Sequence, residues 1–121
     1  MSTRSRINVL CSDGKVKSIY CHFDGADHLD TLNMHYATLE LAEQLVSQGN
    51  LSVLGSMAMD PPVWHTFNDP AEYYCVYYGR DRGDEKSGPK VYDDYFEARD
   101  FGIDIEYIYE FTDGGWIQYK R

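Results

Sequence analysis

The chain has 121 residues, with a hydrophobic fraction of 43% and an aromatic fraction of 15%, which indicate one folded domain and exclude a disordered chain. No apolar run approaches the roughly 20 residues that a membrane-spanning helix needs, and the first residues lack the apolar stretch of a signal peptide. The net charge of −9 disfavours direct binding to nucleic acid, because an acidic surface repels a phosphate backbone.

Two alternating runs around an Asp-Gly pair predict a β-hairpin at the start of the chain. The runs are Ile7–Cys11 and Val16–Phe23, and Asp13-Gly14 lies between them. A two-residue turn at Asp13-Gly14 places Cys11 opposite Val16 and fixes which side chains share the apolar face. A three-residue turn reverses that assignment, because successive side chains along a strand point to opposite faces.

Apolar residues recur at helical spacing between Leu32 and Val46, which predicts a helical segment. Gly49 is typical of a helix end. A break near Ala37 is compatible with the pattern, and Thr38 is then the cap of a second helix.

The middle of the chain predicts a long irregular connection followed by a strand. Asp60-Pro61-Pro62 and Asn68-Asp69-Pro70 interrupt any regular element. The aromatic run Glu72–Tyr78 favours a central strand, and we expect a charged loop over Gly79–Lys90.

The last third of the chain predicts a short helix and a second hairpin. The helix is expected over Asp93–Phe101, with Asp93 as its cap. The hairpin strands are Ile105–Phe111 and Trp116–Tyr119, joined by a turn that contains Asp113-Gly114.

These elements predict one α+β domain over residues 1–121. We expect a mainly antiparallel sheet of about five strands, with two Asp-Gly hairpins and two or three helices on one face. The three cysteines, Cys11, Cys21 and Cys75, have no CxxC spacing, which indicates buried, reduced thiols and not a disulfide framework.

The stretch YCHFDGADH, from Tyr20 to His28, gathers histidines and aspartates in nine residues. On a continuing strand His22 and Asp24 point to the same side, so they can form a His–carboxylate pair. A metal site needs three or four converging ligands, and no HExxH or paired CxxC pattern occurs, so we expect no metal and no cofactor. The alternative is that the pair only closes the end of the sheet.

The stretch GRDRGDE, from Gly79 to Glu85, follows the predicted central strand. Arg80 and Arg82 can hold a carboxylate or phosphate through paired hydrogen bonds. The alternative is a surface loop whose arginines and acids pair with each other. If the two stretches converge, they form one polar binding site, whose predicted residues are His22, Asp24, Arg80, Asp81 and Arg82.

The acidic residues are concentrated toward the end of the chain. Between Asp93 and Asp113 there are eight acidic residues, and Arg99 is the single basic one. Such a field attracts a basic partner, for example a protein that itself binds nucleic acid, although a solvated acidic surface is the simpler interpretation. The predicted acidic interface consists of Asp93, Asp94, Glu97, Asp100, Asp104 and Glu106.

Several motifs, taken in chain order, resemble those of a family of short proteins from tailed bacteriophages and prophages. They are MSTRSRI, YCHFDG, His35-Tyr36, LVSQGNLSVLG and YYGRDRGDE, with YCHFDG and YGRDRG the most specific. Residues 26–32 and 56–69 do not share the resemblance. It implies a viral origin, a location in the host cytoplasm and an accessory role, and it assigns no catalytic residue.

The leading functional hypothesis is therefore a non-enzymatic phage accessory protein that binds and modulates or inhibits a host protein. A nucleic-acid-binding defence complex, such as a CRISPR-Cas complex, is a partner that acidic mimicry would suit. One alternative is a small enzyme or ligand-binding domain that uses His22, Asp24, Arg80 and Asp81. Another is a virion or assembly component, and the oligomeric state is left open.

Overall fold

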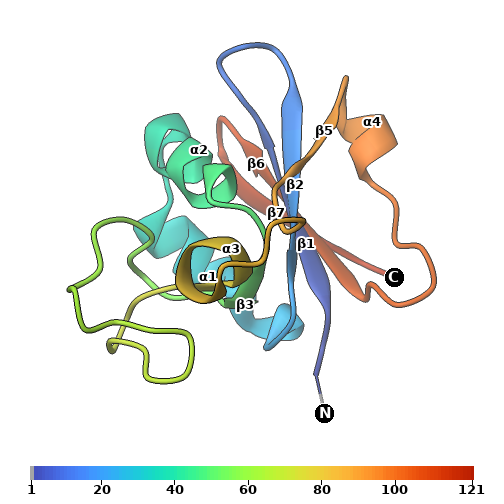
Figure 1. The fold of residues 1–121 in the computed structure, drawn as a ribbon. Helices are drawn as coiled ribbons and strands as arrows, with labels where there is room; N and C mark the ends of the chain where they lie inside the picture. The colour runs from blue at the N-terminus through green and yellow to red at the C-terminus, as the bar shows by residue number, and fades with distance from the viewer. Residues whose placement is uncertain (1) are drawn as a thin grey trace.

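A seven-stranded mixed sheet forms the centre of the computed structural model, which describes residues 2–121 (Figure 1). Met1 of the predicted domain lies outside this range. The strand order is β4-β3-β2-β1-β6-β7, and β5 also pairs with β2. The strands are β1 (Ser5–Leu10), β2 (Val16–Cys21), β3 (Leu51–Val53), β4 (Val76–Tyr77), β5 (Lys90–Tyr92), β6 (Tyr107–Thr112) and β7 (Gly115–Lys120).

The helices are short, and they confirm the α+β class. They are α1 (His28–His35), α2 (Leu39–Ser47), α3 (Tyr78–Arg82) and α4 (Tyr95–Ala98), with a 3-10 turn over Gly25–Asp27. A break between the first two helices, which the sequence pattern left open, is present. Thr38 precedes α2, and its hydroxyl accepts a hydrogen bond from the Leu41 N–H at 3.3 Å.

The first hairpin is confirmed, but its turn has three residues. The Cys11 N–H donates to the Lys15 carbonyl at 2.8 Å, so Ser12, Asp13 and Gly14 form the turn. Gly14 has a φ of +85°, and Asp13 is not among the residues with positive φ. The pairing of Cys11 with Val16 across a two-residue turn is therefore wrong. A two-residue turn of type I′ would need positive φ at both Asp13 and Gly14.

The three-residue turn places Ile7 opposite Ile19 and Ser5 opposite Cys21. Ile7 and Ile19, with Val9, point toward α1 and α2 and are fully buried there, in the core that also contains Leu45. Tyr77 belongs to the same core, and its hydroxyl donates to the Leu45 carbonyl at 2.6 Å.

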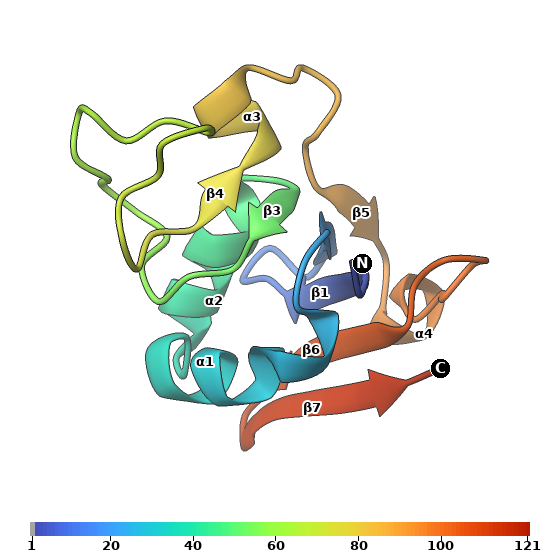
Figure 2. The same cartoon turned by 90° about the horizontal axis from the view of Figure 1, so that it is seen from below.

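The centre of the sheet is a parallel pair, β1 with β6, which joins the two hairpins. The second hairpin, β6 with β7, is confirmed in its predicted place. Helices α1 and α2 cover one face of the sheet, whereas α4 lies on the other (Figures 1 and 2). The Asn8 side chain points away from the main core and donates to the Ala98 carbonyl at the end of α4 at 3.3 Å. The sequence pattern predicts helices on one face only, whereas the helices cover both faces of the sheet (Figures 1 and 2).

Two local predictions differ from the structure. The run Glu72–Tyr78 contains only the two-residue strand β4, and the next residues form α3 where a loop was expected. The last predicted helix is present as α4, but Asp94 caps it by accepting from the Glu97 N–H at 2.9 Å. Asp93 instead pairs with Lys15 on the first hairpin, at 2.6 Å.

Candidate functional site

The predicted His22–Asp24 pair does not form a hydrogen bond or ion pair within residues 2–121. The His22 Nδ1 lies 2.6 Å from the Tyr20 hydroxyl, and its ring packs edge-on against Phe23. Strand β2 ends at Cys21, and Asp24 has a φ of +60°, so the chain turns before a strand can align the two side chains. Residues two apart point to the same side only along a continuous strand, and the strand ends before His22.

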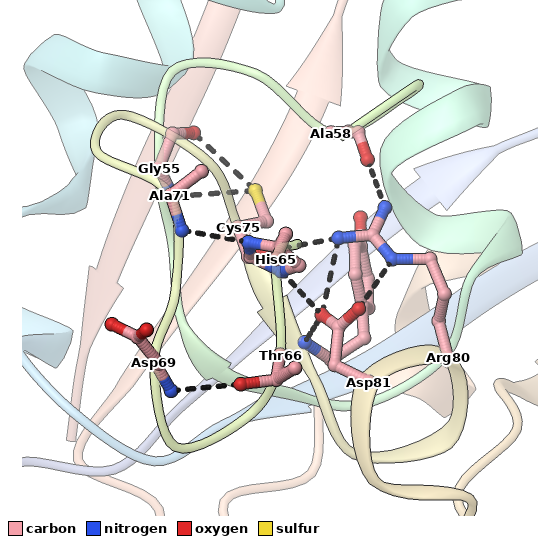
Figure 3. A network of polar contacts seen from close by, with 10 residues as sticks. Gly55, Ala58, His65, Thr66, Asp69, Ala71, Cys75, Arg80 and Asp81 are labelled. Atoms are coloured by element: carbon pink, nitrogen blue, oxygen red, sulfur yellow. Dashed lines mark hydrogen bonds and ion pairs between the residues drawn. The ribbon is translucent and has the colours of Figure 1, made fainter. Parts of the chain in front are cut away.

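Arg80 and Asp81 belong to a buried network that the sequence did not predict (Figure 3). The Asp81 side chain is 4% exposed, and its Oδ2 lies 3.1 Å from the Nε2 of His65. The same oxygen accepts from the Tyr77 N–H at 2.9 Å. Since the His65 Nδ1 accepts from the Ala71 N–H at 2.9 Å, the proton of a neutral His65 is on Nε2 and faces Asp81.

The guanidinium of Arg80 completes the network. Its Nε donates to Asp81 Oδ1 at 2.9 Å, and its Nη2 donates to the Cys75 carbonyl at 3.0 Å. Its Nη1 donates to the Ala58 carbonyl, and the cation lies over the Tyr77 ring at 4.8 Å from the ring centroid. One arginine therefore holds both ends of the connection between β3 and β4.

The electrostatics of Asp81 favour its charged form. Burial alone raises the pKa of this carboxyl, but the hydrogen bonds from Arg80, the Tyr77 N–H and His65 outweigh burial, so the net pKa is lowered. Because both oxygens of Asp81 are bonded inside the fold, its carboxylate holds His65, Tyr77 and Arg80 together. Sequence reasoning missed His65 because its partner is far along the chain and no local motif marks it.

Arg82 lies outside this network, on the surface. Its Nη2 donates to Asp84 Oδ2 at 2.6 Å, and its cation stacks on the rings of Phe67 and Tyr78, at 4.7 and 4.8 Å from the centroids. Within residues 2–121, no hydrogen bond or ion pair links His22 or Asp24 to Arg80, Asp81 or Arg82. The hydrogen bonds and ion pairs of the described residues therefore do not join YCHFDG and GRDRGDE into one polar site.

The six residues of the predicted acidic interface are all exposed on the segment from 93 to 106. Asp93 pairs with Lys15, and Asp104 lies 3.7 Å from Arg4. The other four have no cationic partner within 4 Å among the described residues: Asp94, Glu97, Asp100 and Glu106. Glu110, counted in the same acidic stretch, is only 2% exposed and is paired with Arg99, so it does not add to the surface charge.

Large apolar side chains stand among these carboxylates. Phe96 is 84% exposed and Ile103 is 94% exposed. We define the acidic face as the six acidic residues with these two apolar ones: Asp93, Asp94, Phe96, Glu97, Asp100, Ile103, Asp104 and Glu106. Sequence reasoning found its charges but not its apolar residues, although Phe96 lies within the run DDYFEARD.

The acidic face is anchored to the sheet through α4. The Tyr95 hydroxyl accepts from the Leu10 N–H at 2.7 Å and donates to the Phe111 carbonyl at 2.6 Å. Arg99 donates to both oxygens of Glu110, at 2.7 and 2.9 Å. These contacts tie a one-turn helix to β1 and β6, so its exposed side chains are presented from a fixed backbone.

Further observations restrict the chemistry. Among residues 2–121, no three His, Cys, Asp or Glu side chains gather as a metal site requires, and no helix is long and apolar enough to cross a membrane. Comparison of the chain with protein-family models, with curated proteins and with solved structures found no match.

Proposed function

We propose that this protein is a binding protein that docks its acidic face on a basic surface of another protein. The observation that carries the proposal is the placement of Phe96 and Ile103, almost fully exposed, among six carboxylates, of which only Asp93 and Asp104 have a cationic partner within 4 Å among the described residues. Exposed aromatic and aliphatic groups supply binding energy when they are buried in a complex, and the surrounding charge selects the partner and speeds encounter.

The partner we propose is a host protein in an infected bacterium. This part rests on the motif resemblance to tailed-phage proteins together with the net charge of −9. A protein whose basic surface normally holds nucleic acid, such as a CRISPR-Cas defence complex, would meet carboxylates in place of phosphates. The protein would then act in the host cytoplasm as an accessory inhibitor, without catalysis and without binding nucleic acid itself.

The test is affinity capture from lysate of a phage-susceptible bacterium, with a variant that neutralises the acidic face. Glu97→Gln, Asp100→Asn and Glu106→Gln together remove three charges from exposed positions. The matched control removes three exposed charges elsewhere, with Asp30→Asn, Glu40→Gln and Glu72→Gln. We expect the first variant to lose a partner that the control retains. Retention by both variants would overturn the proposal.

Two further measurements separate charge from apolar contact. The interaction should weaken steeply as salt rises, because exposed charges are screened within about 8–10 Å at physiological ionic strength. Phe96→Ala should weaken it at any salt concentration, by about tenfold or more. Trp64→Ala is the control, since Trp64 is 59% exposed on the β3–β4 connection, which lies across the molecule from α4 (Figures 1 and 2). Loss of binding only with Trp64→Ala would move the interface to that connection.

A further inference from the structure

A groove of about 410 Å³ lies beside the acidic face, at the carboxyl ends of the parallel strands β1 and β6. Its residues come from the end of β1, the start of α2, α4 and the end of β6. The lining residues are Leu10, Cys11, Leu39, Tyr95, Phe111, Thr112 and Asp113. Tyr95 connects the groove to the acidic face, because it follows Asp94 directly and precedes Phe96.

The lining is mainly apolar and includes partly exposed leucines. Leu10 is 44% exposed and Leu39 is 39% exposed, so each has apolar area left to bury. Cys11 is 7% exposed, and burial is the main cause that raises the pKa of its thiol, which therefore stays neutral. The Tyr95 hydroxyl is held by Leu10 and Phe111, so its ring forms a fixed wall.

The rim of the groove is acidic. Asp113 lines it, and Glu43 accepts from the Ser12 N–H next to Cys11. Of the nearby cations, Lys15 is paired with Asp93 and Arg99 with Glu110, whereas Lys17 lies close to the Cys11 thiol and has no ion pair among the described residues. An apolar cleft with unpaired carboxylates at its edge is complementary to an apolar side chain that is flanked by basic residues.

We propose that the groove is an anchor pocket for one leucine or phenylalanine side chain, flanked by lysine or arginine, on the basic partner that the acidic face binds. This inference rests on the proposed function and specifies the chemistry of its partner. The pocket adds a shape requirement, which acidic surface charge alone does not supply. A basic surface without an apolar side chain at the right place would bind more weakly.

The test uses synthetic peptides as probes. One peptide of nine residues has a central phenylalanine flanked by four lysines on each side, and its matched peptide has serine at the centre. We expect the phenylalanine peptide to bind about tenfold more tightly, as burial of one large apolar side chain implies. Equal affinity of the two peptides would overturn the anchor pocket.

Matched variants localise the binding. Leu39 and Leu41 are both on α2 and both 39% exposed, but only Leu39 is among the residues that line the groove. Leu39→Ser should reduce the affinity for the phenylalanine peptide about tenfold, whereas Leu41→Ser should leave it within about twofold. Unfolding midpoints of both variants verify that each is folded. Equal effects of the two substitutions would contradict the inference.

The failure of the pocket differs from the failure of the proposed function. If both peptides bind equally but the variant with Glu97→Gln, Asp100→Asn and Glu106→Gln binds neither, the acidic face stands and the pocket is overturned. If that variant binds both peptides as tightly as the unmodified protein does, the acidic face itself is overturned. Amide shifts in two-dimensional NMR of the peptide complex should cluster at Leu10, Leu39 and Phe111; shifts confined elsewhere would place the anchor outside the groove.

Discussion

The Nε2 of His65 lies 3.1 Å from the Oδ2 of Asp81, and both side chains are almost completely buried. This contact fixes the middle of the β3–β4 connection to the helix that follows β4. A connection of this length without regular structure is uncommon in a compact domain unless something orders it. Here Arg80 and Asp81 supply that order from within the stretch YGRDRG.

Replacement of Asp81 should therefore destabilise the fold. In Asp81→Asn the buried network loses its negative charge beside Arg80, and we expect the free energy of unfolding to fall by about 3 kcal/mol. Urea unfolding measures this. Asp84→Asn is the control, because it breaks an exposed ion pair with Arg82 and should leave the midpoint nearly unchanged. Equal midpoints for the two variants would show that the network contributes nothing.

The same substitution should expose the β3–β4 connection to proteases. Limited chymotrypsin digestion under native conditions reports this, since Trp64 and Phe67 become cleavable when the connection detaches. Faster cleavage at these sites in Asp81→Asn than in Asp84→Asn is the expected result. Cleavage at the same rate would mean that other contacts hold the connection.

His28 should make the protein sensitive to mild acid. Burial is the main cause that lowers the pKa of this histidine to about 4, and its Nε2 has no hydrogen-bond partner within residues 2–121. An unfolded histidine has a pKa of about 6.5, so the unfolded state takes up the proton first as pH falls. The stability that the neutral imidazole provides is complete above about pH 6.5 and declines toward pH 4, by up to about 3 kcal/mol.

The variant His28→Gln tests this dependence, because its side chain does not titrate. Its free energy of unfolding should vary less between pH 6.5 and pH 4 than that of the unmodified protein. His35→Gln, at the exposed end of the same helix, should keep the original profile. A profile unchanged by His28→Gln would assign the acid sensitivity to other groups.

Gly49 should tolerate no side chain. It has a φ of +92°, and an added Cβ would collide with the carbonyl oxygen of Ser87, which accepts from the Asn50 N–H at 2.7 Å. Gly83 has a φ of +81° but open space around it, so it isolates the conformational effect. We expect Gly83→Ala to cost about 1 kcal/mol. Gly49→Ala should cost about 3 kcal/mol, because a backbone clash is added. Thermal unfolding compares them, and equal costs would exclude the clash.

Arg99 should be essential for the buried carboxylate of Glu110. Glu110 is 2% exposed, so Arg99→Met leaves a buried charge without its partner and should cost about 3 kcal/mol. Arg99→Met combined with Glu110→Met should recover most of that loss, because an apolar pair of similar size replaces the ion pair. Denaturant unfolding of the four proteins in this cycle measures the coupling; additive effects would show that the pair is not coupled.

The parts of the fold that were predictable are those encoded by neighbouring residues. The Thr38 cap, the helix break before it and both Asp-Gly hairpins depend on contacts within a few positions. The length of the first turn was not decided, because Asp13-Gly14 suits a turn with positive φ at both residues and one with positive φ at Gly14 alone. That one-residue difference exchanged the two faces of the hairpin.

The rest depends on residues that meet only in the folded chain. Nothing near Asp81 in sequence indicates that His65 reaches it, and nothing near β1 indicates a parallel partner at β6. The surface charges of the acidic face could be predicted because most acidic side chains stay in water, although Asp81 and Glu110 do not. The exposure of Phe96 could not, since an aromatic residue in a short helix is more often buried.

The pairing of β1 with β6 brings Ser5 beside Tyr107, at nearly opposite ends of the chain. The middle of the sheet therefore cannot close until strand β6 has left the ribosome. Contacts of such long sequence separation slow folding, because a large loop must be closed before they form. Newly made chains should remain open to proteases and chaperones until the last strands emerge, and a fragment that ends before Tyr107 should not acquire the fold at all.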